Sequence, residues 1–317
     1  MGFPETKGVL NETFNVNIKD KRMAAKIIDG KQIAADMRAE LKAEVAKLKE
    51  QGIIPGLGVI LVGDDPASQT YVTAKERSCQ EMGIYSDDNR LPANTSQKDL
   101  ISLVKRMNAD AKIHGILVQL PLPKGLNETE VLTTIDPDKD VDGFHPTNVG
   151  RMVVGAKAFL PCTPHGVIQL LLRSGVKIEG ANVVIVGRSN IVGKPLANML
   201  IQKSATANAT VTVCHTRTKD IAFHTRQADI VIAAVGKPKT ITADMVKDGV
   251  VVIDVGVNRI KDATKKSGYR LVGDVDFEAV KEKASLITPV PGGVGPMTIT
   301  MLLYNTVESA KRTAGIR

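Results

Sequence analysis

Aromatic residues are scarce in this chain of 317 residues, which has no tryptophan, four tyrosines and six phenylalanines. Proteins that bind single-stranded nucleic acids stack the bases on aromatic side chains, and few such platforms exist here. Lysines and arginines outnumber acidic residues by 42 to 34, for a net charge of +8, but they are spread over many predicted helices. We therefore expect a small anionic ligand and no nucleic-acid partner.

Long apolar runs and cysteine pairs are also lacking. The longest strongly apolar stretches, such as Gly249–Val257, are far shorter than the roughly 20 residues of a membrane-spanning helix. The first 25 residues contain Glu5, Glu12 and Asp20 and no apolar core, so no signal peptide is visible. Three widely spaced cysteines favour neither a disulfide framework nor a zinc site. The sequence thus predicts a cytoplasmic protein without a membrane or metal partner.

Helical and strand patterns alternate along the chain. Apolar residues at helical spacing predict helices at 33–49, 66–82, 96–108, 164–173 and 297–311. Apolar runs, several of them rich in β-branched residues, predict strands at 57–62, 115–120, 182–186, 209–213, 229–235 and 250–255, and a further strand is predicted near 84–91. Residues 136–151 are predicted to form a loop. This alternation is typical of parallel sheets, so the fold class is α/β, with two domains and a hinge near residues 145–165.

A glycine turn marks the start of the second predicted sheet. Gly187 directly follows a predicted strand, and Gly193 comes where the next helix begins. A pyrophosphate can approach such a turn and meet helix amides. The spacing is not that of the dinucleotide fingerprint, so a purely structural strand-to-helix turn remains an alternative. The next strand ends in Cys214-His215-Thr216-Arg217 without the acid that holds the ribose of NAD, and Arg188 follows the first glycine, which together favour NADP.

A polar stripe lies on the predicted helix at 66–82. Ser68, Tyr71 and Lys75 are spaced by three and four residues and therefore share one helical face. A solvated surface would show the same pattern. This helix begins at the carboxyl end of a predicted strand, where ligands bind in α/β folds, which favours a site. A partly desolvated Lys75 could transfer protons near neutral pH.

Three further features are candidates for the site. Gln119 ends a predicted buried strand and is either a site residue or a packed amide. Asp142 belongs to Asp140–Gly143, which could equally be a plain Asx turn. The loop at 287–298 holds three glycines among three prolines, and its stiffness suits contact with a ligand more than a linker. Of the histidines at 145, 165, 215 and 224, only His215 is kept as a candidate.

Six segments together carry a resemblance to a known family. They are Ser68–Lys75 (SQTYVTAK), Gly115–Pro123 (GILVQLPLP), Lys139–Gly143 (KDVDG), Pro161–Pro164 (PCTP), Gly187–Gly193 (GRSNIVG) and Pro289–Thr298 (PVPGGVGPMT). In this order they resemble the bifunctional methylenetetrahydrofolate dehydrogenase/cyclohydrolase family, and the likeness runs from about Lys26 to Arg312. The first 25 residues lie outside it.

The resemblance implies a homodimer whose subunits have two α/β domains around a cleft, the second a Rossmann-like, parallel-sheet NADP-binding domain. It divides the chain into an N-terminal extension at 1–25, a folate-binding catalytic domain at 26–163 that the C-terminal helix at 296–317 joins, and the NADP domain at 164–295. Methylenetetrahydrofolate would be oxidised with NADP and the methenyl product hydrolysed to formyltetrahydrofolate, a one-carbon donor for purine biosynthesis. The alternatives are a monofunctional dehydrogenase and a folate- or NADP-binding protein without catalysis.

The resemblance also implies roles for residues. Lys75 would be the general acid/base, Gln119 would hydrogen-bond it, Tyr71 would stack on the aminobenzoate ring and Asp142 would bind the pterin. Folate would also contact Ser68, Val118, Leu120, Pro291, Gly292, Gly293, Val294 and Gly295. NADP would contact Thr163, Gly187, Arg188, Ser189, Ile191, His215, Thr216, Gly236 and Val257.

Overall fold

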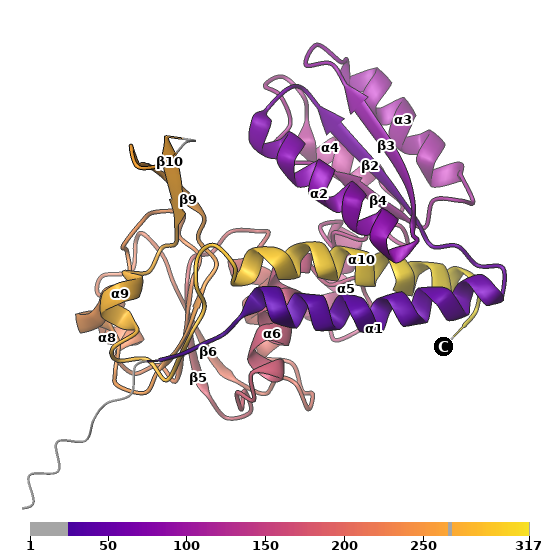
Figure 1. Ribbon diagram of the computed structural model, residues 1–317. Coiled ribbons are helices and arrows are strands. Elements are labelled where there is room, and N and C mark those ends of the chain that lie inside the picture. Colours follow the sequence, from indigo (N-terminus) through magenta and orange to yellow (C-terminus); the bar gives the residue numbers. More distant parts are fainter. Residues whose placement is uncertain (1–24, 266–267, 317) are drawn as a thin grey trace, which may run out of the picture.

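The computed structural model describes residues 25–265 and 268–316, so the predicted extension at 1–25 lies, except for Ala25, outside the described residues. Strands and helices alternate and gather into two units, which two long helices connect (Figure 1). Within the described ranges, no helix has the length and apolar character needed to cross a membrane. The predicted α/β class, with two units, is confirmed.

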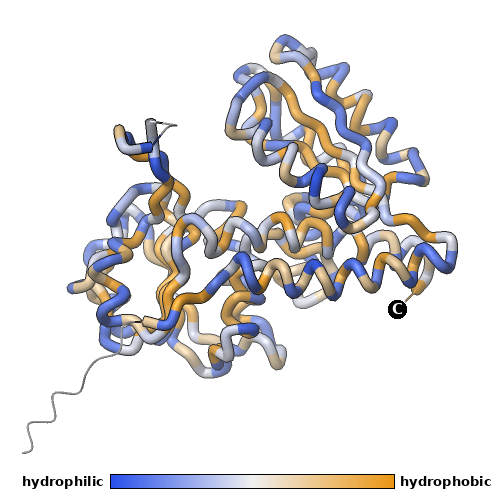
Figure 2. Tube along the Cα trace, in the orientation of Figure 1, coloured by the Kyte–Doolittle hydropathy of each residue, from blue (hydrophilic) through white to orange (hydrophobic). Residues whose placement is uncertain are grey.

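The smaller sheet is parallel and has the strand order β3-β2-β4. Its elements are β2 (Gly56–Val62), α2 (Pro66–Met82), β3 (Tyr85–Leu91), α3 (Gln97–Ala109), β4 (Gly115–Val118) and α4 (Glu128–Thr134). The central strand β2 is wholly buried and apolar, whereas the edge strand β3 is hydrophilic (Figure 2). Strand β4 ends at Val118, two residues earlier than predicted, although the Gln119 N–H still donates to the Ile60 carbonyl at 2.9 Å. Gln119 is therefore the first residue beyond the carboxyl edge of this sheet.

The larger sheet is parallel throughout, with the order β1-β11-β8-β7-β5-β6. Its strands are β1 (Lys26–Ile27), β5 (Asn182–Val186), β6 (Thr210–Cys214), β7 (Ile230–Ala233), β8 (Val251–Asp254) and β11 (Leu286–Ile287). The two-residue strands β1 and β11 are too short to produce a sequence pattern. Because β1 pairs with β11, residues 26 and 27 lie in this sheet, and the prediction that the first domain begins at residue 26 is wrong at these two positions.

The remaining elements surround the larger sheet and fill the connection between the units. They are α5 (Pro146–Val153), α6 (Cys162–Arg173), α7 (Gly193–Leu200), α8 (Ile221–Thr225), the 3₁₀ helix η1 (Ala243–Met245), the antiparallel pair β9 (Asn258–Lys261) and β10 (Tyr269–Val272), and α9 (Phe277–Val280). The predicted loop at 136–151 is wrong at its end, because α5 begins there. His145 caps this helix through Nδ1, Pro146 suits its first position, and Asn148 and Met152 bury one face.

Two long helices, α1 (Gly30–Glu50) and α10 (Val294–Thr313), lie side by side, and α10 also packs on α6 (Figure 1). Their buried side chains form one core with one face of both sheets. Alternation along the strands shows this: Val183 and Ile185 join that core, whereas Val184 and Val186 pack on the opposite face. Helix α10 begins three residues earlier than predicted, so Val294 belongs to its first turn and not to a loop. The two units thus share one continuous apolar core.

His165 lies on α6 and contacts Tyr304 of α10 edge-on, with ring centroids 5.7 Å apart. Burial lowers the pKa of His165 to about 4. The unfolded chain therefore takes up a proton first, near pH 6.5, and the stability that the neutral ring contributes is lost as the pH falls from there toward 4. A pKa change of this size corresponds to about 3 kcal/mol at most.

We expect the apparent unfolding temperature of the variant His165→Leu to decrease less between pH 7 and pH 4.5 than that of the parent chain. The substitution removes the titrating group but keeps an apolar side chain of similar length. Thermal unfolding at several pH values measures the two slopes. Equal slopes would mean that His165 keeps its ordinary pKa in the folded protein.

Candidate functional site

A cavity of about 360 Å³ opens where the carboxyl edge of the smaller sheet faces the larger sheet and the start of α10. It brings together residues that were predicted to bind folate and residues that were predicted to bind NADP. The predicted folate-binding residues in its lining are Tyr71, Lys75, Val118, Gln119, Leu120, Asp142, Val294 and Gly295. The predicted NADP-binding residues are Thr163, Ile191 and Val257. Residues more than 200 positions apart therefore meet at one place. This cavity is the candidate functional site.

Helix α2 delivers Lys75 to the cavity. The Asp65 carboxylate caps the helix by accepting the Ser68 N–H at 2.8 Å, and Pro66 occupies the first turn. Ser68 is itself buried under this turn and does not line the cavity. Lys75, two turns further on, is only 8 % exposed.

The Lys75 ammonium donates to the Gln119 Oε1 at 2.9 Å, which is the contact that the resemblance implied. The Gln119 Nε2 in turn donates to the Leu120 carbonyl at 2.7 Å, so the amide is held with its oxygen toward the lysine. If Gln119 were only a packed amide, this would explain why its nitrogen bonds a backbone carbonyl, but not why its oxygen faces the Lys75 ammonium. A neutral acceptor leaves Lys75 free to gain or lose its proton.

Burial sets the protonation of the site. It lowers the pKa of Lys75, and the nearby Asp142 carboxylate opposes this change. Burial likewise raises the pKa of Asp142, and Lys75 opposes that change. Each group therefore stabilises the charged form of the other in a place where water cannot. A lysine whose pKa is lowered in this way is suited to proton transfer near neutrality.

The loop of Asp142 is organised by its neighbour Asp140. The Asp140 carboxylate accepts the backbone N–H groups of Phe144 and His145 and the Asn148 Nδ2, and burial raises its pKa to about 6. The turn predicted for Asp140–Gly143 thus exists, but Asp140 makes it. Asp142 is left to face the cavity. Asn305 of α10 fastens the loop by donating to the Val141 carbonyl at 2.8 Å.

The glycine turn between β5 and α7 is required by packing. A Cβ on Gly187 would lie 2.1 Å from the Ala234 carbonyl oxygen, and a Cβ on Gly193 would lie 2.1 Å from the Gly187 oxygen. Gly187 also has a φ of 136°, which favours glycine. The structural alternative for this motif therefore accounts for both glycines, so they do not by themselves indicate a cofactor.

The surroundings of this turn nevertheless fit an anionic cofactor. The Gly187 N–H donates to the Cys214 carbonyl at 2.9 Å, so the turn adjoins the end of β6, where His215 and Thr216 follow. Arg188 is exposed and directly follows Gly187, and the segment 214–219 at the end of β6 contains no acid that would repel a phosphate. The Ser189 Oγ is engaged in the turn by accepting the Val192 N–H at 3.1 Å. Cationic and donor groups at a glycine cradle suit the ribose phosphate of NADP.

Several predicted residues lie outside the cavity. They are Ser68, Gly187, Arg188, Ser189, His215, Thr216, Gly236, Pro291, Gly292 and Gly293. Packing accounts for Gly293 as it does for Gly187, because a Cβ on Gly293 would lie 2.6 Å from the Pro289 carbonyl oxygen. Gly236 donates its N–H to the Asp274 carboxylate at 2.9 Å.

The sequence reasoning missed part of the lining: Leu117, Phe144, Val192, Val255, Thr298 and Ile299. Two of them carried a signal. Phe144 directly follows the Asp142-Gly143 pair, and Val255 stands at the carboxyl end of a predicted strand. Thr298 ends the candidate loop at 287–298, but its contact with Thr163, whose hydroxyl lies 2.9 Å away, forms only once α10 and α6 have packed.

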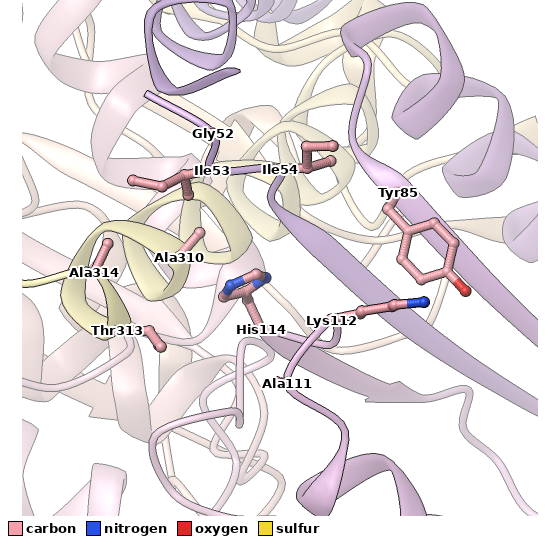
Figure 3. Close-up of a pocket in the computed structure, with 10 residues that line it drawn as sticks. All are labelled: Gly52, Ile53, Ile54, Tyr85, Ala111, Lys112, His114, Ala310, Thr313 and Ala314. Carbon is pink, nitrogen blue, oxygen red and sulfur yellow. The ribbon is translucent and has the colours of Figure 1, made fainter. Parts of the chain in front are cut away.

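A separate hollow of about 490 Å³ lies near the end of α10 (Figure 3). Its lining residues are Gly52, Ile53, Ile54, Tyr85, Ala111, Lys112, His114, Ala310, Thr313 and Ala314. Burial lowers the pKa of His114, and its Nδ1 accepts the Gly56 N–H at 3.1 Å, so the ring is engaged in holding β2. Within the described ranges, no group of three or more His, Cys, Asp or Glu side chains could hold a metal ion.

Comparison with known proteins agrees with this geometry. Residues 28–142 match the catalytic domain, and residues 161–314 the NAD(P)-binding domain, of the tetrahydrofolate dehydrogenase/cyclohydrolase family. The bifunctional protein FolD of Dehalococcoides mccartyi strain CBDB1 is 61 % identical over 295 residues, which cover 93 % of this chain and 99 % of the relative. That of Moorella thermoacetica is 59 % identical over 290 residues, 92 % of this chain and 100 % of the relative.

Solved structures show the same likeness. The bifunctional enzyme FolD from Campylobacter jejuni has a TM-score of 0.86 and 52 % identity, with 92 % of this chain and 100 % of that chain covered. The Trypanosoma brucei methylenetetrahydrofolate dehydrogenase-cyclohydrolase, solved with NADP cofactor and inhibitor, has a TM-score of 0.87 and 42 % identity, with 92 % and 99 % covered. The chain belongs to the tetrahydrofolate dehydrogenase/cyclohydrolase family.

Proposed function

We propose that the cavity around Lys75 is the single site of two consecutive reactions. The enzyme oxidises methylenetetrahydrofolate to methenyltetrahydrofolate with NADP and then hydrolyses the product to formyltetrahydrofolate. The observation that carries the one-site assignment is the cavity itself. It joins the Lys75–Gln119 pair and Asp142 to Ile191, Val255 and Val257 of the larger sheet.

The oxidation depends on orientation. A hydride leaves the carbon between two nitrogens, whose lone pairs stabilise the cation that forms, so the step needs no strong acid or base. NADP supplies the hydride acceptor. The Asp142 carboxylate holds the pterin by accepting hydrogen bonds from the N–H groups of the pterin, and the half-exposed Tyr71 ring stacks on the aminobenzoate. These two contacts and the apolar walls keep the reacting carbon toward the larger sheet.

The hydrolysis depends on proton transfer. Water adds to the cationic carbon and loses a proton. One carbon–nitrogen bond then breaks as its nitrogen gains a proton and the new hydroxyl loses its remaining proton to become the formyl carbonyl. Lys75 holds and moves these protons, because burial lowers its pKa and Gln119 orients it with a neutral acceptor. The same lysine thus serves water addition and ring opening.

We place the cofactor along the glycine turn and the end of β6, with Arg188, His215 and Thr216 toward the ribose phosphate. Ser189, Gly236 and Thr163 line its course, and the loop at 291–293 borders the folate and nicotinamide region. We also propose domain limits at 163–164 and 295–296, which separate the cofactor-binding segments from the catalytic part of the chain. A homodimer in the cytoplasm that supplies purine biosynthesis completes the proposal, and sedimentation equilibrium of the full chain tests the dimer.

Asp142 should act chiefly in folate binding. We expect Asp142→Ala to weaken binding of a folate analogue by about tenfold or more, because hydrogen bonds to a charged group contribute roughly 1.5–3 kcal/mol. NADP affinity should remain, because Asp142 belongs to the loop beside β4 of the smaller sheet, whereas the glycine turn follows β5 of the larger sheet. Calorimetry with each ligand measures both. Normal folate binding would instead support a purely structural role for this loop.

Steady-state kinetics with NADP tests the proposed function. NADPH formation follows the first step, and the methenyl absorbance follows its appearance and its hydrolysis. The bifunctional enzyme should show both steps. A chain that accumulates the methenyl product would be a monofunctional dehydrogenase, and one that binds both ligands without turnover would be a binding protein.

A further inference from the structure

Two carboxylates outside the described chemistry are buried next to each other behind the cofactor side of the cavity. Asp254 ends β8 and is 3 % exposed, and Asp274 follows β10 and is fully buried. A Cβ on Gly273 would lie 1.8 Å from the Asp254 Oδ2, and a Cβ on Gly256 would lie 2.2 Å from the Asp274 Cγ. Both glycines therefore make room for the carboxyl groups. Burying two acids together is unfavourable unless hydrogen bonds stabilise them.

Each carboxylate accepts three hydrogen bonds. The Asp254 Oδ1 accepts the N–H groups of Gly256 at 3.0 Å and Asp274 at 2.9 Å, and its Oδ2 accepts that of Val275 at 2.9 Å. Burial raises the pKa of Asp254 to about 6, and the Asp274 carboxylate adds to this effect.

Asp274 binds a different set of donors. Its Oδ2 accepts the N–H groups of Val235 at 2.6 Å and Gly236 at 2.9 Å, and its Oδ1 accepts the Asn258 Nδ2 at 2.8 Å. The pair thus connects the turn after β7, the loop between β8 and β9, and the end of β10.

These segments form the cofactor side of the site. Val255 and Val257, on either side of Gly256, line the same cavity as Lys75. The turn after β7 is in contact with the glycine turn, because a Cβ on Gly187 would meet the Ala234 oxygen. Arg188, which follows β5, and His215, which follows β6, are by contrast absent from the lining of the cavity. The pair therefore supports the part of the cofactor path nearest the reacting carbon.

We propose that Asp254 and Asp274 are positioning residues for the oxidation step, and that they hold the turn after β7 and the loop after β8 in the shape that receives the nicotinamide end of the cofactor. This inference rests on the proposed cofactor placement. The hydrolysis uses Lys75 and needs no cofactor, so it does not depend on the pair.

The two acids should respond differently to the same substitution. In Asp254→Asn the amide nitrogen must face at least one backbone N–H, because both carboxylate oxygens accept from the backbone. In Asp274→Asn the oxygen can stay on the Val235 and Gly236 N–H groups, and the Asn258 amide can rotate to accept from the new nitrogen. Asp274→Ala removes every acceptor and serves as the severe variant at that position.

Four measurements test the proposal on the full-length enzyme: dehydrogenase kcat and KM for NADP, cyclohydrolase rate, and calorimetric binding of adenosine 2′,5′-bisphosphate, the fragment without nicotinamide. We expect Asp254→Asn and Asp274→Ala to lower dehydrogenase kcat/KM by about tenfold or more, and Asp274→Asn by about threefold or less. Cyclohydrolase rate and fragment affinity should stay within about twofold of the parent.

Three results would overturn the proposal. Unchanged dehydrogenase kinetics in Asp254→Asn would show that the pair does not act on the cofactor. Parallel loss of cyclohydrolase activity or fragment binding would show general support of the fold. Equal losses in the two asparagine variants would show that charge matters and not the hydrogen-bond pattern. Absence of both activities in the parent chain would instead refute the proposed function.

Discussion

Lys75→Met is expected to abolish the hydrolysis of methenyltetrahydrofolate while the oxidation of methylenetetrahydrofolate persists at a reduced rate. Water activation needs a group that titrates, and methionine keeps the length of the side chain without a proton to exchange. Loss of a positioned general acid/base typically lowers a rate by about a hundredfold to ten-thousandfold. The oxidation needs orientation, which the remaining contacts of Tyr71 and Asp142 still provide.

Both rates are measured on the same preparation, the first by loss of the methenyl absorbance and the second by NADPH formation. Lys98→Met, at an exposed position of α3, is the matched control and should leave both rates unchanged. Unchanged hydrolysis in Lys75→Met would remove this lysine from its proposed role. Equal loss of both activities would assign it to substrate binding.

Arg188→Ala is expected to weaken NADP binding by about tenfold to more than a hundredfold and to leave NAD binding nearly unchanged. The ribose phosphate of NADP carries nearly two negative charges at neutral pH, and NAD lacks this group. Arg188 is exposed and follows Gly187, whose N–H bonds the Cys214 carbonyl at the end of β6, so it can donate a forked pair of charge-assisted hydrogen bonds there. His215 and Thr216 at the same end add further donors.

The dissociation constants of both cofactors, measured by calorimetry, decide this prediction. Arg77→Ala is the control, because Arg77 lies on α2 and pairs with Glu81 at the surface. Comparable losses for NADP and NAD would show that Arg188 binds the shared pyrophosphate or supports the turn. The preference for NADP would then have another origin.

The elements themselves could be predicted from local patterns. Helix α2 begins and ends at the predicted residues because Pro66 opens it and Gly83, with a φ of 73°, closes it. The alternation of helices and apolar strands also sufficed to predict parallel sheets. Errors occurred where the pattern was short or polar: β1 and β11 have two residues each, and α5 depends on a cap and two buried side chains within an acidic segment.

Within the site, the sequence alone determined which residue types were available and that they follow strand ends. It could not determine whether Asp140 or Asp142 makes the turn in Asp140–Gly143, because either aspartate can bond backbone N–H groups a few residues further on. Tertiary packing decided this point: Asn148 and two backbone N–H groups converge on Asp140, and Asp142 is left to meet Lys75. Burial, which lowers the pKa of Lys75, likewise arises only when α2 meets the other walls of the cavity.

The sequence by itself therefore determined the α/β class, the position of the longer helices and strands to within a few residues, and the chemistry of the individual side chains, because these depend on neighbours within a few turns of the chain. The tertiary structure decided which of those side chains meet. Helix α10, close to the end of the chain, brings Thr298 to Thr163 and Asn305 to the Asp142 loop, and β1 joins the sheet of the other unit. These contacts join residues more than 130 positions apart, and a local pattern does not encode separations of that size.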